Sequence, residues 1–283
     1  MFEKIKDYLW SEWSRDGFGY FHHFGSDFNP VCNASNKNMR YAEIKKEDLR
    51  YEENGWANVI EYIRFTDDNS GILLTIPEFI EPILKCTELH EKDFPADKIC
   101  DLLINLLKEK AERLGLFIDK HGIYTNLKHG IIFGADKNTK LNLSKKQEDS
   151  IRYYTAKYNN GEYAFILPEQ FYEYSDYCIN YGTLIDNKIV SYSGNTFSYA
   201  LMSENEIITI SISTLEDYRQ KGYAVSNVVS FTEYLLSGSE EVKHVQGVLY
   251  DTPSTNINSQ KTAKSAGLVE IAKIFHIYCR RIV

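Results

Sequence analysis

The segment Tyr218–Ala224, YRQKGYA, places a glycine beside two cationic residues at the start of an apolar-periodic stretch. Arg219 and Lys221 favour a bound anion, and Gly222 lets that anion approach the backbone because it carries no side chain. If a helix begins here, its first N–H groups lack partners within the helix and carry partial positive charge. The segment therefore predicts a phosphate or pyrophosphate site. The alternative is that Gly222 is a turn residue and that Arg219 and Lys221 are solvated.

Such a site needs a strand before the loop and a helix after it, and the surrounding sequence predicts both. Glu206–Thr214, EIITISIST, alternates apolar and polar residues over most of its length, which indicates a strand with one buried face. Gly222–Leu236 carries an apolar stripe at helical spacing. Val242–Tyr250 is predicted to be the next strand, and Ser254–Ala266 a helix that Gly267 closes.

A second pattern begins at Asn256: NINSQKTAKSAGLVE contains Ser259, Ala263 and Gly267. It resembles the N-x-x-S-x-x-x-A-x-x-x-G-F/L segment of the GNAT N-acetyltransferase family, and YRQKGYA resembles the R/Q-x-x-G-x-G/A pyrophosphate loop of that family. GTLIDNKIVS, residues 182–191, resembles the hairpin that leads into the family's central strand. The resemblance covers residues 150–280. It is greatest to the group that contains the zwittermicin A resistance acetyltransferase, which also has a long N-terminal extension.

The resemblance implies an α+β protein (mixed α/β). A GNAT fold, with a central mixed sheet flanked by helices, would occupy the C-terminal half after an α+β N-terminal domain. In this family acetyl-CoA lies between two splayed parallel strands, here 206–214 and 242–250, and its pantetheine arm pairs with the first of them. The implied coenzyme contacts are Ile212, Ser213, Thr214, Arg219, Gln220, Lys221, Gly222, Tyr223, Ala224, Val225, Asn256 and Ser259. Asn256 also fits a plain helix N-cap, which is compatible with that role.

The sequence departs from the family at the usual catalytic positions. The acid that related members carry on the central strand is Thr209 here, and the tyrosine four residues before the final glycine is Ala263. Glu206 is the candidate general base, although its strand parity is opposite unless a bulge intervenes; otherwise it is a solvated strand residue. The candidate replacement for the missing acid and tyrosine is Tyr250, at the end of the second strand, or a water molecule.

Composition and charge narrow the class of protein. The chain has 283 residues, of which 43% are hydrophobic and 25% charged, as in ordinary soluble globular proteins. A formal net charge of −8 disfavours nucleic-acid binding, and no apolar run is long enough for a membrane helix. The N-terminus lacks a signal-peptide pattern. Five dispersed cysteines without a CxxC motif indicate reduced thiols, and we expect a cytoplasmic protein.

The N-terminal half shows helices but no motif that indicates chemistry of its own. Phe2–Trp13 is a predicted helix, and Pro77 follows a predicted helix start at Thr75. Ala96–Leu114 is the clearest helix, and Gly115 ends it. Its apolar stripe comprises Ile99, Leu102, Leu103, Leu106, Leu107, Ala111 and Leu114.

The polar stretch Asp136–Asp149 has no apolar period and is the predicted boundary. The two predicted domains are therefore 1–145, which we expect to shape the acceptor site, and 146–283, which we expect to bind acetyl-CoA.

Other reactive side chains are weaker candidates. His22-His23, followed by Asp27, lacks the further ligands that a metal site needs, so packing or substrate contact is the better interpretation. Cys178 and Cys279 have no local nucleophile signature. We therefore expect no metal.

The sequence predicts an acyltransferase that moves an acetyl group from acetyl-CoA to a primary amine of a small molecule, such as an antibiotic or a metabolite. Two alternatives stay open. The acceptor can be a protein amine, or the chain can be a GNAT-like module that binds CoA without catalysis, because the familiar acid and tyrosine are missing. The sequence does not indicate the oligomeric state.

Overall fold

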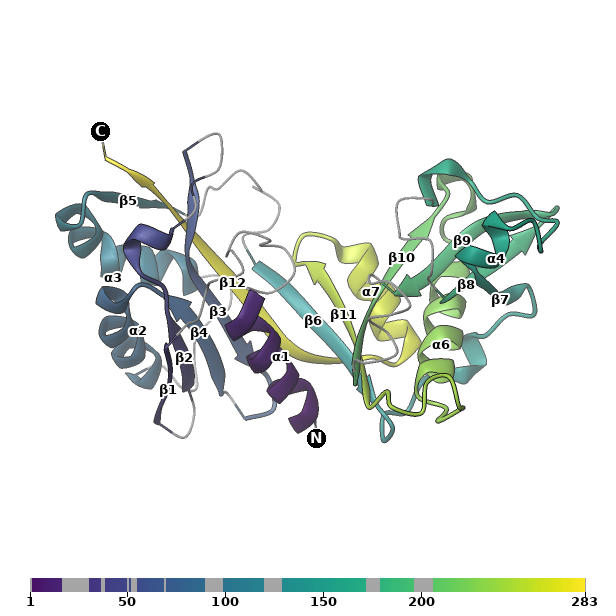
Figure 1. Ribbon diagram of the computed structural model, residues 1–283, viewed down its shortest axis with the longest axis horizontal. Helices are drawn as coiled ribbons and strands as arrows, with labels where there is room; N and C mark the ends of the chain where they lie inside the picture. Colours follow the sequence, from purple (N-terminus) through teal and green to yellow (C-terminus); the bar gives the residue numbers. More distant parts are fainter. Residues whose placement is uncertain are drawn as a thin grey trace. The chain divides into compact units, whose positions relative to one another are not determined.

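The computed structural model describes residues 2–16, 31–36, 39–49, 51, 55–68, 70–89, 99–119, 129–171, 179–195 and 206–282 (Figure 1). The chain forms two compact units. Unit 1 comprises Met1–Ile5, Ile132–Thr252 and Asn256–Glu270. Unit 2 comprises Lys6–Ile131, Pro253–Thr255 and Ile271–Val283.

Unit 1 is built on a mixed sheet in the order β6-β11-β10-β9-β8-β7. Its strands are β6 (His129–Asp136), β7 (Ser150–Tyr154), β8 (Ile179–Ile185), β9 (Lys188–Asn195), β10 (Ile207–Thr214) and β11 (Gly247–Pro253). Its helices are α4 (Thr155–Asn159), α6 (Tyr223–Leu235) and α7 (Ile257–Ala266), with short 3-10 turns η2 (Leu143–Lys145), η3 (Glu169–Phe171) and η4 (Glu216–Tyr218).

Local sequence explains the hairpin that leads into the centre of this sheet. β8 and β9 are antiparallel, and the turn between them consists of Asp186 and Asn187, both in the left-handed region with φ of 46° and 62°. Asp and Asn tolerate this conformation best among residues with side chains, and two such residues match the twist of a hairpin. The predicted hairpin is confirmed, with its turn one residue earlier than expected.

Helix α6 packs against the central strands through a buried face. Val228, Val229, Phe231 and Leu235 are all fully buried. The same helix also buries the polar side chains of Ser226 and Asn227, and Asn227 hydrogen-bonds to Thr183 of β8. The predicted helix from residue 222 to 236 is confirmed to within one residue at each end.

The strands of unit 2 follow the order β1-β2-β4-β3-β12, with β5 also paired to β12. The strands are β1 (Val31–Asn36), β2 (Met39–Glu43), β3 (Ala57–Phe65), β4 (Gly71–Thr75), β5 (Leu116–Asp119) and β12 (Val269–Arg281). The 3-10 turn η1 spans Lys46–Asp48, and the helices are α1 (Glu3–Asp16), α2 (Pro77–Leu89) and α3 (Ile99–Arg113).

Helix α3 corrects one detail of the predicted stripe. Leu103, Leu107 and Ala111 are buried, but Leu102 and Leu106 are 38% and 45% exposed. The seven apolar positions span more of the helix circumference than the neighbouring elements cover, so the outer two leucines face solvent.

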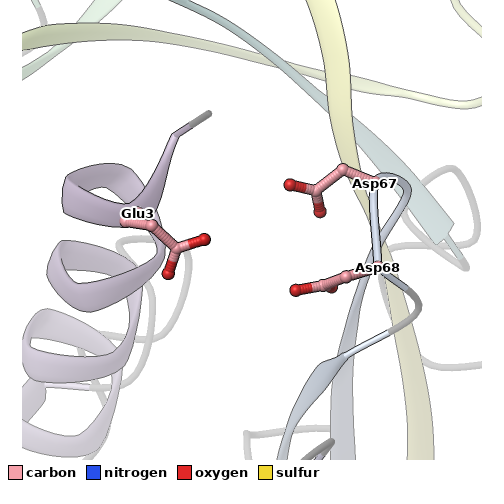
Figure 2. A group of neighbouring side chains, drawn as sticks. All are labelled: Glu3, Asp67 and Asp68. Carbon is pink, nitrogen blue, oxygen red and sulfur yellow. The ribbon is translucent and has the colours of Figure 1, made fainter.

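Two aspartates on the turn between β3 and β4 bind a lysine of α1. Lys6 Nζ lies 2.8 Å from Asp67 Oδ1 and 2.7 Å from Asp68 Oδ2. Burial opposes the charge on Lys6, but hydrogen bonds to the two aspartates outweigh it and raise the pKa of the lysine. Figure 2 shows both carboxylates on this turn, and it also shows Glu3 in the first turn of α1. The lysine thus neutralises part of the acidic turn.

The predicted α+β class is confirmed, but the division of the chain differs from a single boundary at residue 145. β6 starts at His129 yet pairs with β11, and the C-terminal strand β12 pairs with β3 and β5. Asp136–Asp149 is therefore an ordered part of unit 1 rather than a connection. Its polar composition reflects its place on the surface, where it hydrogen-bonds to α6 and α7. Among the described helices, none combines the length and apolar character needed to cross a membrane.

Candidate coenzyme site

The two parallel strands at the centre of unit 1 pair only where they begin. Ile207–Thr209 of β10 lie opposite Gly247–Leu249 of β11, and the parallel register stops there. β10 continues to Thr214 with β9 on its other side, while β11 continues to Pro253. Beyond Thr209, no strand among the described residues pairs with the inner edge of β10, which carries backbone N–H and C=O groups. Such an edge can take an extended ligand as an additional strand.

This splayed pair places the predicted strand residues Ile212, Ser213 and Thr214 on the separated part of β10, and all three are partly exposed. The predicted strand Val242–Tyr250 is wrong at its start, because β11 begins at Gly247. Val242 and Val245 are fully buried in turns after α6, so their apolar character reflects core contacts rather than a strand.

The loop that follows β10 has the backbone of an anion site. Gln220 and Gly222 are left-handed, with φ of 63° and 84°. Bends of this kind make successive N–H groups converge. The first helical hydrogen bond of α6 runs from Ser226 N to Gly222 O at 3.0 Å, so the N–H groups of Tyr223, Ala224 and Val225 precede the helical ladder. The helix dipole adds positive potential at the same place.

The two predicted cations lie at the surface of this loop. Arg219 is exposed, and its Nε lies 3.4 Å from the carbonyl oxygen of Thr214, at the end of β10. Lys221 is exposed, with Nζ 4.8 Å from the centre of the Tyr218 ring. Both side chains therefore stay close to the loop and contribute charge at its rim.

The start of α7 brings three predicted residues together. Asn256 is the N-cap, and its Oδ1 accepts a hydrogen bond from Ser259 N at 3.1 Å. Ser259 Oγ lies 2.6 Å from the hydroxyl of Tyr250. The N-cap interpretation of Asn256 is thus confirmed, and it fixes the first turn of α7 beside β11.

Tyr250 is the first residue of β11 beyond the paired segment, and 2% of its surface is exposed. Burial raises the pKa of Tyr250 to about 12, although the hydrogen bond with Ser259 opposes the shift. The phenol therefore stays protonated at neutral pH and can donate a proton. Ala263, one turn further along α7 than Ser259, is fully buried.

Glu206 lies at the opposite, paired end of the two strands. Its carbonyl oxygen accepts hydrogen bonds from Gln246 N and Gly247 N at 2.7 and 3.2 Å. Its carboxylate is 59% exposed and lies 3.4 Å from Lys4 Nζ. At the usual strand rise, Glu206 is roughly 10 Å along β10 from the point where the pairing ends at Thr209. The structure thus places Glu206 apart from the Tyr250 and Ser259 pair.

Two residues that the sequence did not single out join the site. Gln147 donates from Nε2 to Lys221 O at 3.2 Å, and Asn227 hydrogen-bonds to Thr183 and Ser191 beneath α6. The sequence did hold a signal for Asn227, which is a polar residue within the apolar stripe of the predicted helix. Gln147 gave no signal, because it lies in a mostly polar stretch without an apolar period.

The remaining candidates do not add to this site. His22, His23, Asp27 and Cys178 lie outside the described residues. Cys279 is fully buried in β12 of unit 2, and burial raises the pKa of its thiol to about 11, which makes it a poor nucleophile.

Comparisons with known proteins give remote structural similarity. No protein-family model matches the chain, and no curated protein matches it. A GCN5-related N-acetyltransferase-like protein from Streptococcus suis is 17% identical, with a TM-score of 0.37 over 83% of this chain and 88% of that chain. A GNAT-family acetyltransferase from Colwellia psychrerythraea is 12% identical, with a TM-score of 0.39 over 97% and 95%.

A tandem GNAT protein from the clavulanic acid biosynthesis pathway is 10% identical, with a TM-score of 0.42 over 62% of this chain and 58% of that chain. Because identities and TM-scores of this size do not establish a family, the activity of this chain must be inferred from its own loop and strands.

Proposed function

We propose that the chain is a GNAT-type acyltransferase that transfers the acetyl group of acetyl-CoA to a primary amine. The observation that carries the proposal is the order of three features in unit 1. Two parallel strands separate after Thr209 and Leu249, the first of them ends at a left-handed loop, and that loop opens helix α6. An extended coenzyme with a pyrophosphate in its middle fits these features in this order.

The proposed coenzyme pose follows from the donors of the loop and the strand. The pyrophosphate accepts hydrogen bonds from the N–H groups that open α6, with Arg219 and Lys221 at the rim. The pantetheine arm lies along the unpaired edge of β10 beside Ile212 and pairs with its backbone. The thioester then lies near the point where the strands meet, between Thr209 and the first turn of α7.

The proposed reaction is direct acyl transfer. The neutral amine attacks the thioester carbonyl, a tetrahedral oxyanion forms, and its collapse breaks the C–S bond to release CoA. A backbone N–H at the separated strands can stabilise the oxyanion. Tyr250 donates its proton to the departing thiolate and regains one from the acylated nitrogen, and Ser259 orients the phenol. A water molecule receives the proton that the substrate ammonium loses before the attack, and much of the rate comes from positioning.

The proposed acceptor is a small-molecule amine. The leading alternative from another class is a CoA-binding module without catalysis. Thr209 and Ala263 favour it, since they stand where related enzymes carry an acid and a tyrosine. A third candidate is a protein amine.

One assay separates these functions. Full-length protein is incubated with acetyl-CoA and panels of small amines and of peptides, and the products are followed by mass spectrometry. A mass increase of one acetyl group on a small amine, together with free CoA, is the expected result. Acetylation of peptides alone would assign a protein acceptor. Tight CoA binding without any acetylated product would favour the non-catalytic module.

A further inference from the structure

The polar segment 137–149 contacts both helices of the candidate coenzyme site. At one end, Asn142 N donates to Ala266 O at 2.9 Å and Asn142 Nδ2 donates to Ser265 O at 3.2 Å, both at the C-terminus of α7. At the other end, Lys146 pairs with Glu233 of α6 at 2.5 Å. The segment is therefore fixed to α6 and α7 rather than loosely attached.

Gln147 is the residue of this segment that meets the left-handed loop. Its backbone N–H donates to Ser226 Oγ at 2.8 Å, in the first turn of α6. Its side-chain Nε2 donates to Lys221 O at 3.2 Å, and the same atom would lie 3.1 Å from a Cβ placed on Gly222. The Oε1 atom of Gln147 is buried, and no described residue forms a hydrogen bond with it. The carboxamide is thus held directly against Lys221 and Gly222.

A buried network continues from Gln147 into the sheet. Ser150 N donates to Gln147 O at 3.2 Å, and Ser150 Oγ donates to Asn227 Oδ1 at 2.7 Å. Asn227 is fully buried, and its Nδ2 donates to Thr183 Oγ1 at 3.1 Å and Ser191 Oγ at 3.2 Å. A buried polar network with its groups satisfied specifies one arrangement of the elements that it joins.

The network ends at the strand that the proposed pantetheine arm follows. Ser191 Oγ lies 2.8 Å from Thr214 Oγ1, and it lies 3.3 Å from Ser213 O. Hydrogen bonds therefore lead from the loop carbonyl of Lys221, through Gln147 and Asn227, to the end of β10. The two parts of the backbone that would hold the coenzyme are connected by one set of contacts.

We propose that Gln147 is a positioning residue for the coenzyme pyrophosphate: it holds the left-handed loop Gln220–Gly222 in its anion-binding conformation, and the Asn227 network fixes that loop relative to β10. The inference rests on the proposed function. Without Gln147, the carbonyl of Lys221 loses its donor and the loop is free to turn its N–H groups away from the anion. The effect should fall on binding of the pyrophosphate, while the pantetheine edge of β10 stays intact.

The test compares two matched substitutions in the same segment. Gln147→Glu and Asn142→Asp each replace a side-chain amide with a carboxylate, so both variants add one negative charge. In the unsubstituted protein each amide donates to a backbone carbonyl at 3.2 Å, Lys221 O for Gln147 and Ser265 O for Asn142. Only the first lies at the loop. Calorimetry of the full-length variants measures affinity for CoA, and inhibition assays measure affinity for pantetheine, which lacks the pyrophosphate.

We expect Gln147→Glu to weaken CoA binding about tenfold or more, the usual scale for losing one such contact, and Asn142→Asp to change it less than about threefold. Pantetheine inhibition should be unchanged in both variants, and kcat at saturating acetyl-CoA should change less than KM. Equal CoA affinities for the two variants would overturn the inference.

Gln147→Leu separates positioning from charge, because it removes the donor without adding a carboxylate. We expect it also to weaken CoA binding, by about threefold to tenfold. If Gln147→Leu binds CoA normally, charge repulsion alone explains the weaker binding of Gln147→Glu. That result would overturn the positioning role of Gln147. If the unsubstituted protein binds no CoA, the proposed function itself fails, which is a different outcome from either of these.

Discussion

Tyr250 and Ser259 share the shortest contact of the candidate site, at 2.6 Å between the phenol oxygen and Oγ. Tyr250 comes from β11 and Ser259 from α7, and the cap at Asn256 helps to fix the first turn of the helix that carries Ser259. The buried phenol, with a pKa raised to about 12, is a proton donor over the whole range of ordinary assays. It offers the chemistry that the tyrosine missing at Ala263 would supply.

Tyr250→Phe removes the proton donor and keeps the ring. We expect kcat to fall about tenfold or more, near the lower end of the usual range for a general acid, with KM for acetyl-CoA little changed. Because the tyrosine is protonated below about pH 10, the variant should keep the shape of the pH–rate profile in that range. Ser259→Ala, which keeps the phenol but loses its partner, should show a smaller loss. A Tyr250→Phe enzyme with unchanged kcat would remove Tyr250 from the mechanism.

At the scale of elements, the sequence predicted those whose signals are local. The loop at Gly222, the cap at Asn256 and the closing Gly267, which has φ of 92°, each impose their own backbone geometry, and all three lie where expected. The start of β11 was misplaced because Val242 and Val245 are buried by tertiary contacts in turns. Gln147 was missed because its role depends on a partner far along the chain.

Another local feature with a measurable consequence is the turn between β3 and β4. Burial opposes ionisation of Asp68, but hydrogen bonds from Lys6 and Ser70 outweigh it and lower the pKa to about 2. A lowered carboxyl pKa stabilises the fold above the unfolded value of 3.8, and that contribution is lost as the pH falls toward 2. Asp68 is half exposed, so the contribution is small.

Asp68→Asn should therefore lower the free energy of unfolding at pH 7 by less than about 1 kcal/mol. The difference in the free energy of unfolding between the variant and the unsubstituted protein should shrink as the pH is lowered to about 3. The stabilisation from the lowered pKa of Asp68 is then partly lost, because Asp68 becomes protonated in the unfolded chain. Denaturant titrations at both pH values measure this. A difference that grows on acidification would contradict the assigned ion pair with Lys6.

At the scale of the whole molecule, each unit depends on a segment that is distant in sequence. β6, from the N-terminal side of residue 145, pairs with β11 in unit 1 and buries Ile132 and Phe133. β12, at the C-terminal end, pairs with β3 and β5 in unit 2. These long-range pairings leave no local signal in the sequence. Composition therefore suggested one boundary near residue 145, whereas β6 and β12 each pair with strands from the other side of that boundary.

The fragment 146–283 should therefore not reproduce the coenzyme site. It lacks β6, which leaves the edge of β11 unpaired, and it leaves β12 without its neighbours, which exposes apolar surface. We expect the fragment to aggregate or to bind CoA far more weakly than the full chain. Solubility and calorimetric titration of the purified fragment measure both. CoA affinity equal to that of the full-length protein would show that neither pairing supports the site.

Titration of two Gly222 variants with CoA shows whether the loop at Gly222 binds the pyrophosphate of the coenzyme. Gly222→Ala and Gly222→Glu both place a side chain at φ of 84°, at a cost of about 1–2 kcal/mol, and both bring a Cβ to 3.1 Å from Gln147 Nε2. Only the glutamate adds bulk and negative charge where the anion should lie. We predict that the unsubstituted protein binds CoA and that Gly222→Glu binds it at least about tenfold more weakly than Gly222→Ala. Equal CoA affinity in the two variants, or none in the unsubstituted protein, would contradict the account.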